Sequence, residues 1–252
     1  MEYDASVRRQ ALLHIETHGL APTHRRIVSL VGAGKHVLDI GCATGYLAEA
    51  MVANGCMVTG IEQDADAAET ARRYCRDVIV GDAGDSAVLA QLAHAGAVYD
   101  VVVCADILEH LIDPWHILSM CQSLLHPASR DRQILVSIPN MAYWRMRWDL
   151  MRGRFEYTDT GLLDRTHVRF FTDRTFREMA ERCGYRIAGQ VINDAGLPGF
   201  PHPVDWDRLP VWVRKIVTAR PNLCVFHSIY RLVPASTGRK EPAKGPMKRE
   251  GD

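Results

Sequence analysis

Residues 36–62, HVLDIGCATGYLAEAMVANGCMVTGIE, constrain the fold more than any other part of the chain. The segment opens with Val37–Ile40, a short apolar run that is typical of a buried strand in a parallel sheet. A glycine turn follows, and residues 46–53 then place apolar side chains at helical spacing. Residues 57–61 predict a second buried strand, which ends at Glu62. The order strand, turn, helix and strand predicts an α/β fold.

The same segment predicts binding of a nucleoside. Gly41 and Gly45 let the backbone approach a ligand closely, and the following helix offers free N–H groups. Glu62, roughly twenty residues after the turn, can accept hydrogen bonds from both ribose hydroxyls. Ala43 occupies the middle of the turn, so the dinucleotide pattern G-x-G-x-x-G is absent, and so is a P-loop. Asp39 lies just before the turn and suits a ligand with an ammonium group better than one with phosphates.

The run V-L-D-I-G-C-A-T-G, followed by G-I-E, resembles motif I of the class I S-adenosylmethionine (SAM)-dependent methyltransferases. That family usually has G-x-G-x-G here, and Ala43 departs from it by one methyl group. The resemblance implies a single Rossmann-like α/β domain with a seven-stranded, mostly parallel sheet whose last strand is antiparallel, and it implies SAM as the cofactor. The expected organisation is N-terminal capping helices in 1–34, the methyltransferase domain in 35–235 with an acceptor cap in 141–172, and a disordered tail in 236–252.

The resemblance also implies roles for individual residues. Asp39 and the glycine turn would hold the methionine end of SAM, Glu62 with Gln63 the ribose, and Asp82 with Ala83 the adenine. The wall near the methyl group would be formed by residues 105–107. The expected cofactor-binding residues are Asp39, Gly41, Cys42, Ala43, Gly45, Glu62, Gln63, Asp82, Ala83, Ala105, Asp106 and Ile107.

Residues 106–114, DILEHLIDP, resemble the LEH…DP signature of the ubiquinone-biosynthesis O-methyltransferases. In that group an acid, an acid and a histidine at this spacing can bind magnesium, which would here be Asp106, Glu109 and His110. Hard cations prefer oxygen ligands, and one imidazole weakens the case, so we expect no metal. We predict His110 as a general base. The alternative is that Glu109 and His110 form hydrogen bonds within the fold.

The segment 141–172 combines aromatic and basic residues. Its run W-x-x-R…G-R-F-x-Y…G-L-L-D-x-T-H-x-R-F-F resembles a bacterial subgroup of small-molecule methyltransferases, including MetW-like proteins, in which this insert determines acceptor specificity. His167 is a second base candidate, and its alternative role is to stabilise the turn around Asp164 and Thr166. Other interpretations are a nucleic-acid surface, which a net charge of zero disfavours, and an amphipathic surface that contacts a membrane or a partner. The expected acceptor contacts are Tyr143, Trp144, Arg147, Arg154, Tyr157 and Arg169.

Hydrophobic patterning predicts the remaining elements. Expected helices lie in 5–17, 22–31, 65–74, 115–125, 173–183 and 210–219, with Thr172 as an N-cap and Gly184 as a C-cap. Expected strands lie in 78–80, 99–105, 134–138, 186–192 and 225–233.

Composition limits the function classes. The seven cysteines are scattered without a C-x-x-C pair, so neither a disulfide framework nor a zinc site is indicated. No apolar signal core or membrane-spanning run occurs, and a cytoplasmic protein is expected. We therefore predict an enzyme that transfers a methyl group from SAM to an oxygen or nitrogen of a small-molecule acceptor in natural-product, saccharide or quinone-type biosynthesis. The alternatives are a non-catalytic SAM-binding protein and a nicotinamide-dependent oxidoreductase.

Overall fold

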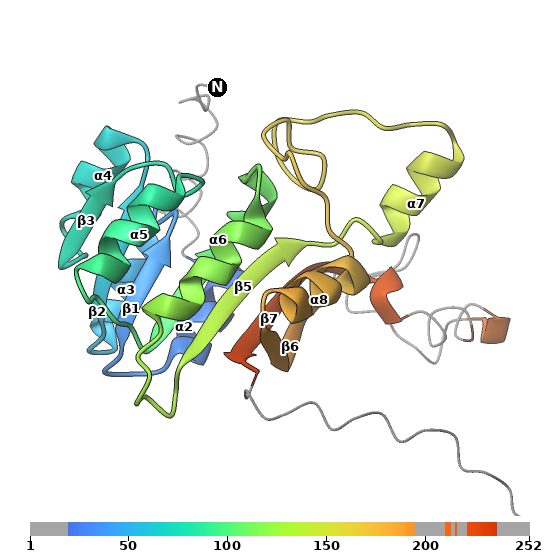
Figure 1. The fold of residues 1–252 in the computed structure, drawn as a ribbon. Helices are drawn as coiled ribbons and strands as arrows, with labels where there is room; N and C mark the ends of the chain where they lie inside the picture. The colour runs from blue at the N-terminus through green and yellow to red at the C-terminus, as the bar shows by residue number, and fades with distance from the viewer. Residues whose placement is uncertain (1–19, 195–209, 213–214, 216–220, 236–252) are drawn as a thin grey trace, which may run out of the picture.

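The computed structural model describes residues 20–194, 210–212, 215 and 221–235 of the chain. These residues form a seven-stranded sheet in the order β3-β2-β1-β4-β5-β7-β6 (Figure 1). Only β7 runs against its neighbours, β5 and β6. The predicted mostly parallel sheet with an antiparallel last strand is therefore confirmed. The strands are β1 (His36–Ile40), β2 (Met57–Glu62), β3 (Asp77–Val80), β4 (Val101–Ala105), β5 (Gln133–Pro139), β6 (Tyr185–Asp194) and β7 (Val225–Pro234).

Two hydrophobic cores lie on opposite faces of the sheet, because side chains alternate between the faces along each strand. On β4, Val102 and Cys104 point into one core, while Val101 and Val103 point into the other. The first core is covered by α5, α6 and α8, and the second by α2, α3 and α4 (Figure 1). This two-sided burial explains why the central strands are almost entirely apolar. The helices are α2 (Pro22–Val31), α3 (Tyr46–Ala53), α4 (Ala65–Ala71), α5 (Ser86–His94), α6 (Pro114–Met120), α7 (Trp144–Met151) and α8 (Asp173–Arg182).

Several helices follow the sequence prediction closely, and others differ from it. α2 and α3 have the predicted bounds. The side chain of Thr172 caps α8 by accepting a hydrogen bond from the N–H of Thr175, as predicted. α4 ends at Ala71, and α6 ends at Met120 and continues as a 3₁₀ turn, so both helices are shorter than expected. α5 was not predicted, although Asp85 is a good N-cap whose carboxylate accepts from the N–H of Ala87 at 2.9 Å.

Some predictions fall outside the described residues: the helix in 5–17, most of the helix in 210–219, and the disordered tail in 236–252. None of the helices in the described part of the chain is long and apolar enough to cross a membrane.

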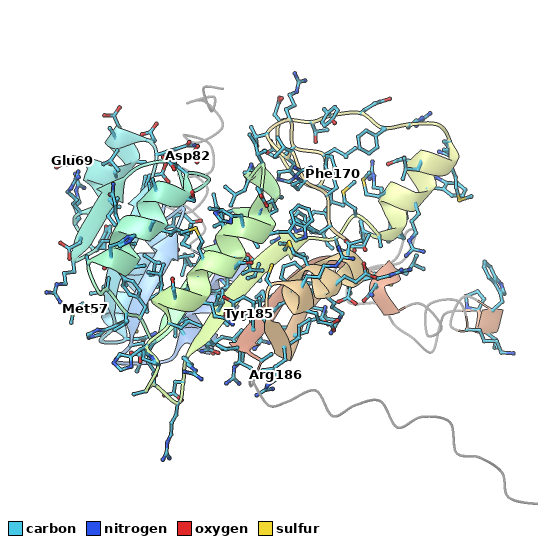
Figure 2. All side chains as sticks on the ribbon, viewed as in Figure 1. Met57, Glu69, Asp82, Phe170, Tyr185 and Arg186 are labelled. Carbon is cyan, nitrogen blue, oxygen red and sulfur yellow. The ribbon has the colours of Figure 1, made fainter. Side chains whose placement is uncertain are left out.

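The carboxyl ends of the parallel strands meet along one edge of the sheet, which is uppermost in the views shown. In Figure 2, Asp82 just after β3 and Phe170 of the cap lie towards this edge. Met57 at the start of β2 and Arg186 near the start of β6 lie towards the opposite edge. Ligands of open α/β sheets bind outside the carboxyl ends of the strands, so the site is expected there.

Candidate active site

The glycine turn after β1 has three residues in the left-handed region. Gly41, Ala43 and Gly45 have φ angles of 78°, 49° and 80°. A Cβ atom on Gly41 would lie 2.9 Å from Cδ1 of Ile107, and one on Gly45 would lie 2.9 Å from Cα of Ala71. The left-handed backbone favours glycine at both positions, and at Gly45 close packing against the backbone of α4 requires it as well.

The left-handed backbone conformation of Ala43 is less favourable for alanine than it would be for glycine. A left-handed conformation costs an L-residue roughly 1–2 kcal/mol, while glycine loses about 0.5–1 kcal/mol more entropy on folding. We expect Ala43→Gly to raise the free energy of unfolding by about 0.5–1 kcal/mol, measured by urea denaturation. Ala50→Gly in α3 is the matched control and should instead lower it by about 1 kcal/mol. A loss of stability in Ala43→Gly as large as in the control would contradict this interpretation.

Glu62 braces the glycine turn from the end of β2. Its side chain is buried, and its two carboxylate oxygens accept hydrogen bonds from the N–H groups of Ala43 at 3.0 Å and Asp64 at 2.9 Å. These two bonds fix the orientation of the carboxylate of Glu62, the residue expected to bind the ribose hydroxyls. Gln63 is exposed immediately after it.

Asp39 is the least satisfied carboxylate near the turn. It is 1% exposed, and neither of its side-chain oxygens has a hydrogen-bond partner. Burial, reinforced by the charge of Glu62, raises its pKa to about 7. A buried carboxylate without partners beside a glycine cradle is suited to a cationic ligand group.

The remaining predicted cofactor residues occupy the same edge. Asp82 follows β3, where Oδ1 accepts from the N–H of Gly84 at 2.7 Å, and Ala83 beside it is buried. The side chain of Cys42 is also buried, and its Sγ lies only 2.5 Å from where a Cβ on Gly60 would be. Cys42 therefore packs beneath the turn, and only its backbone is placed to contact a ligand.

Asp106, directly after β4, contacts side chains from three other elements, β5, β7 and α2. It has a left-handed φ of 53°. Its Oδ1 accepts from Oγ of Ser137 at 2.6 Å and lies 2.9 Å from Nε2 of His227, while Nε2 of His24 lies 3.6 Å from Oδ2. Burial opposes ionisation, but the charge and hydrogen bond of His227, with the bond from Ser137, keep the pKa of Asp106 well below its usual value. His24 and His227 were not predicted, and nothing in their local sequence indicates a site.

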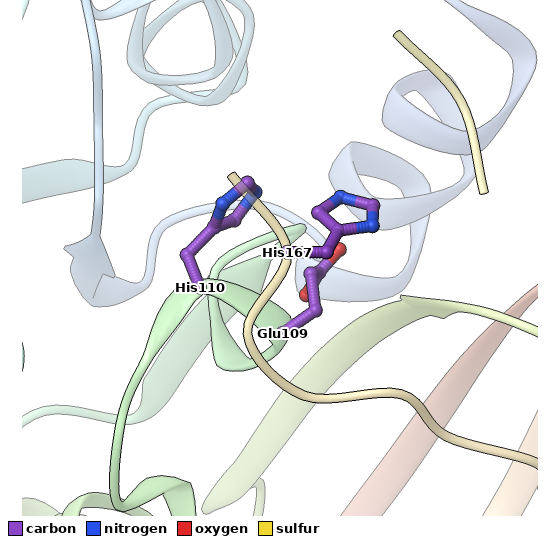
Figure 3. Close-up of side chains that lie close together, drawn as sticks. All are labelled: Glu109, His110 and His167. Carbon is purple, nitrogen blue, oxygen red and sulfur yellow. The ribbon is translucent and has the colours of Figure 1, made fainter. Parts of the chain in front are cut away.

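The two predicted base candidates are brought together from distant parts of the chain. His110 and His167 meet edge to face, with ring centroids 4.8 Å apart, and Glu109 lies beside them (Figure 3). Nδ1 of His110 is 3.2 Å from the carbonyl oxygen of Thr166, and Nδ1 of His167 is 3.2 Å from that of Leu162. Burial lowers the pKa of both histidines. Both rings are therefore neutral near pH 7, and Nδ1 carries the hydrogen because a carbonyl oxygen only accepts.

Glu109 is buried beneath these histidines. It is 1% exposed, its Oε2 has no hydrogen-bond partner, and burial raises its pKa well above the usual value. Its backbone oxygen accepts from the N–H groups of Val168 and Arg169, both at 2.9 Å. These two bonds attach the segment carrying His167 to the turn carrying His110. His110 and His167 each form a hydrogen bond to a backbone carbonyl within the fold, as the alternative to a catalytic role expected.

The predicted acceptor contacts are spread over the cap, and several are engaged by the protein itself. Tyr143 is buried edge-on against Phe226, with centroids 5.5 Å apart, and Trp144 packs beside Tyr143. Nε of Arg147 donates to the carbonyl oxygen of Ala142 at 2.6 Å.

The other three lie closer to the surface. The guanidinium of Arg169 donates to the carbonyl oxygen of Ile112 and lies over the ring of Trp115. Tyr157 and Arg154 are exposed. Of the six, Tyr157 and Arg154 have the most accessible side chains.

The known proteins with similar sequences are methyltransferases. A family model described as "Methyltransferase domain" matches residues 12–190, which is more than half of the chain. The ubiquinone biosynthesis O-methyltransferase of Pectobacterium carotovorum is 38% identical over 96 residues, covering 37% of this chain and 40% of that protein. The enzyme of the same name from Histophilus somni is 36% identical over 118 residues, covering 44% and 50%. The matches thus span half or less of these relatives' lengths.

Solved structures show the same fold. A SAM-dependent methyltransferase from Archaeoglobus fulgidus superposes with a TM-score of 0.63 at 19% identity, covering 88% of this chain and 98% of that one. The magnesium protoporphyrin IX methyltransferase of Synechocystis, with S-adenosylhomocysteine bound, has a TM-score of 0.54 at 18% identity and covers 84% and 82%.

Proposed function

The chain belongs to the SAM-dependent methyltransferase family, and we propose that it transfers the methyl group of SAM to a hydroxyl oxygen of a small-molecule acceptor. The observation that supports this most directly is the arrangement at the end of β1. There a tightly packed glycine turn, a buried carboxylate without partners on Asp39, and the oriented carboxylate of Glu62 occur within one segment.

The residues present fit SAM. Asp39 offers its unpartnered carboxylate to an ammonium group, and Glu62 offers carboxylate oxygens to ribose hydroxyls. Gly41 and Gly45 leave room where side chains would collide. Asp82 is proposed to accept from the adenine amino group. When bound, SAM supplies a methyl group activated by a sulfonium.

The acceptor is proposed to bind between the end of β4 and the cap. An oxygen acceptor is favoured because the curated relatives are named O-methyltransferases. We place its hydroxyl at the cluster of Glu109, His110 and His167, since this cluster follows the residues expected to line the methyl donor. The exposed cap residues Tyr157 and Arg154 are proposed to contact the rest of the acceptor. Much of the rate would come from holding oxygen and methyl in line.

The test combines binding and turnover. Calorimetry with SAM and S-adenosylhomocysteine should show micromolar binding, and a panel of phenols, catechols and hydroxylated acids should yield S-adenosylhomocysteine with at least one acceptor. We expect His110→Ala and His167→Ala to lower turnover by about 100-fold or more with SAM affinity unchanged. The control His94→Ala, at an exposed position at the end of α5, should retain full activity.

The outcomes separate the candidate functions. SAM binding without turnover on any acceptor would favour a non-catalytic SAM-binding protein. Absence of SAM binding, together with fluorescence enhancement of a reduced nicotinamide cofactor, would favour an oxidoreductase.

A further inference from the structure

We infer that Cys42 and Cys75 form an oxidation-sensitive thiol pair, which hydrogen peroxide converts into a disulfide beneath the glycine turn. Cys42 lies within that turn, and Cys75 lies between α4 and β3. Both thiols are free, and the residues are 2% and 6% exposed. The proposed methyl transfer uses neither thiol, so the pair is available for a separate chemistry.

The two sulfur atoms meet beside Gly60 of β2, in the core covered by α2, α3 and α4. The two thiols are hydrogen-bonded to each other. A Cβ atom on Gly60 would lie 2.5 Å from Sγ of Cys42 and 3.4 Å from Sγ of Cys75. A side chain at this position would collide with Cys42, so the glycine provides the space in which the two thiols meet.

Cys75 is the thiol that an oxidant reaches first, because it lines a surface groove of about 660 Å³ beside the start of β3. Arg72 and Arg76 line the same groove. Each also contacts a carboxylate, of Glu69 and Asp77, but these ion pairs are exposed and therefore weak. Nearby guanidinium groups favour the thiolate form of cysteine, which is the form that reacts with peroxide.

The reaction takes place in two steps. The Cys75 thiolate attacks one oxygen of hydrogen peroxide, the O–O bond breaks, and the leaving hydroxide takes up the proton that Cys75 released, which gives a sulfenic acid and water. The sulfur of Cys42 then attacks the sulfenic sulfur, the S–S bond forms, and the S–O bond breaks as the hydroxyl leaves with the Cys42 proton as a second water. Two thiols are thus oxidised by two electrons, and one peroxide is reduced to two waters.

The disulfide is expected to distort the glycine turn. Bonded sulfurs lie about 2.05 Å apart, whereas non-bonded heavy atoms lie roughly 3.5–4.0 Å apart, so the two residues must move towards each other. The backbone of Cys42 is tied into the turn, because its N–H donates to the carbonyl oxygen of Ile61 at 3.0 Å and its carbonyl oxygen accepts from the N–H of Gly45 at 2.9 Å. Moving Cys42 therefore shifts the backbone that is proposed to hold the methionine end of SAM. This consequence rests on the proposed function, whereas formation of the disulfide does not.

The first experiment maps the disulfide in the full chain. Reduced protein is treated with submillimolar hydrogen peroxide, blocked with N-ethylmaleimide, denatured and digested with trypsin without reduction. We expect the peptide Tyr74–Arg76 to be joined to the peptide His36–Arg72. Because Cys56 lies in the same peptide as Cys42, fragmentation in the mass spectrometer must place the bond at Cys42. No disulfide, a bond at Cys56, or only sulfinic acid at Cys75 would overturn the inference.

The second experiment measures SAM affinity by calorimetry before and after oxidation. Wild-type affinity should fall at least ten-fold with peroxide and return when the protein is reduced. Cys75→Ala should keep the affinity of the untreated wild type throughout. Cys121→Ala is the matched control, because Cys121 also bonds to a second thiol, that of Cys104, but both residues are 0% exposed. This control should lose affinity on oxidation as the wild type does, and circular dichroism verifies the folding of both variants.

The remaining outcomes are distinguishable. A loss of affinity in oxidised Cys75→Ala as large as in the wild type would overturn the assignment of the pair. A mapped disulfide with unchanged SAM affinity would overturn its effect on the glycine turn. Absence of SAM binding by the reduced wild type would instead count against the proposed function, and the peptide map would still decide whether the thiol pair forms.

Discussion

Asp39→Asn is expected to stabilise the free protein at pH 8 while weakening SAM binding by ten-fold or more. In the folded chain Asp39 has a pKa of about 7, against 3.8 as the usual value, because it is buried without partners and close to Glu62. The folded state therefore holds a proton that the unfolded state releases. The stability of the wild-type protein falls as pH rises from about 4 to 7, and the full penalty applies above pH 7.

The size of this effect follows from the shift. About 1.4 kcal/mol per pKa unit gives a penalty of roughly 4 kcal/mol at pH 8. The buried asparagine amide remains unpartnered and costs about 1–3 kcal/mol, so the net gain in the free energy of unfolding is about 1–3 kcal/mol. At pH 4, where the wild-type penalty is nearly absent, the cost of the unpartnered amide remains, so Asp39→Asn should be less stable than wild type by about 1–3 kcal/mol. Urea denaturation of both proteins from pH 4 to pH 8 measures this, with exposed Asp66→Asn as a control that should change stability by no more than about 0.5 kcal/mol.

SAM binding should respond in the opposite sense. If the carboxylate of Asp39 holds the ammonium group, wild-type affinity rises roughly ten-fold between pH 5.5 and 7 as Asp39 ionises. The affinity of Asp39→Asn should be weak and nearly independent of pH over this range. An unchanged affinity and pH profile in the variant, by calorimetry, would exclude Asp39 from cofactor binding.

The glycine turn and its flanking elements could be predicted because their determinants are local. The apolar run of β1, the positive φ of Gly41 and Gly45, and the acid ending β2 all lie within one short segment. The sequence also suggested the family's mostly parallel sheet. The sequence did not predict that Glu62 also accepts a hydrogen bond from the N–H of Ala43, because that bond depends on how β1 and β2 pair.

The acceptor side was less predictable, because its residues converge from separate elements. His110 follows β4, and His167 is carried by the cap. The two are brought together by the backbone bonds from Val168 and Arg169 to Glu109 and by the bond between Nδ1 of His110 and the carbonyl oxygen of Thr166. His24 and His227 reach Asp106 from α2 and β7, far apart in sequence. Such clusters are produced by tertiary packing. Residue type could therefore indicate His110 and His167 as candidates, but it could not predict that they lie together beside Glu109.

Glu62→Ala is expected to weaken SAM binding by about ten-fold or more and also to destabilise the free protein. Charge-assisted hydrogen bonds are worth roughly 1.5–3 kcal/mol each, and Glu62 makes two with the N–H groups of Ala43 and Asp64. Losing both should lower the free energy of unfolding by about 3–6 kcal/mol. Calorimetry at a temperature where the variant is fully folded measures the affinity, and urea denaturation measures the stability.

Asp64→Ala separates the two effects because it alters the turn between β2 and α4, whose N–H group bonds Glu62, and leaves the carboxylate of Glu62 in place. Its side chain caps α4 by accepting from the N–H of Ala67 at 2.8 Å, so about 1 kcal/mol of stability should be lost. SAM affinity should stay within about two-fold of wild type, since this cap makes only a local contribution. Equal losses of affinity in the two variants would mean that the order of the turn between β2 and α4, rather than a contact from Glu62, determines binding. Unchanged affinity in Glu62→Ala would remove the ribose role altogether and leave Glu62 as a brace for the glycine turn.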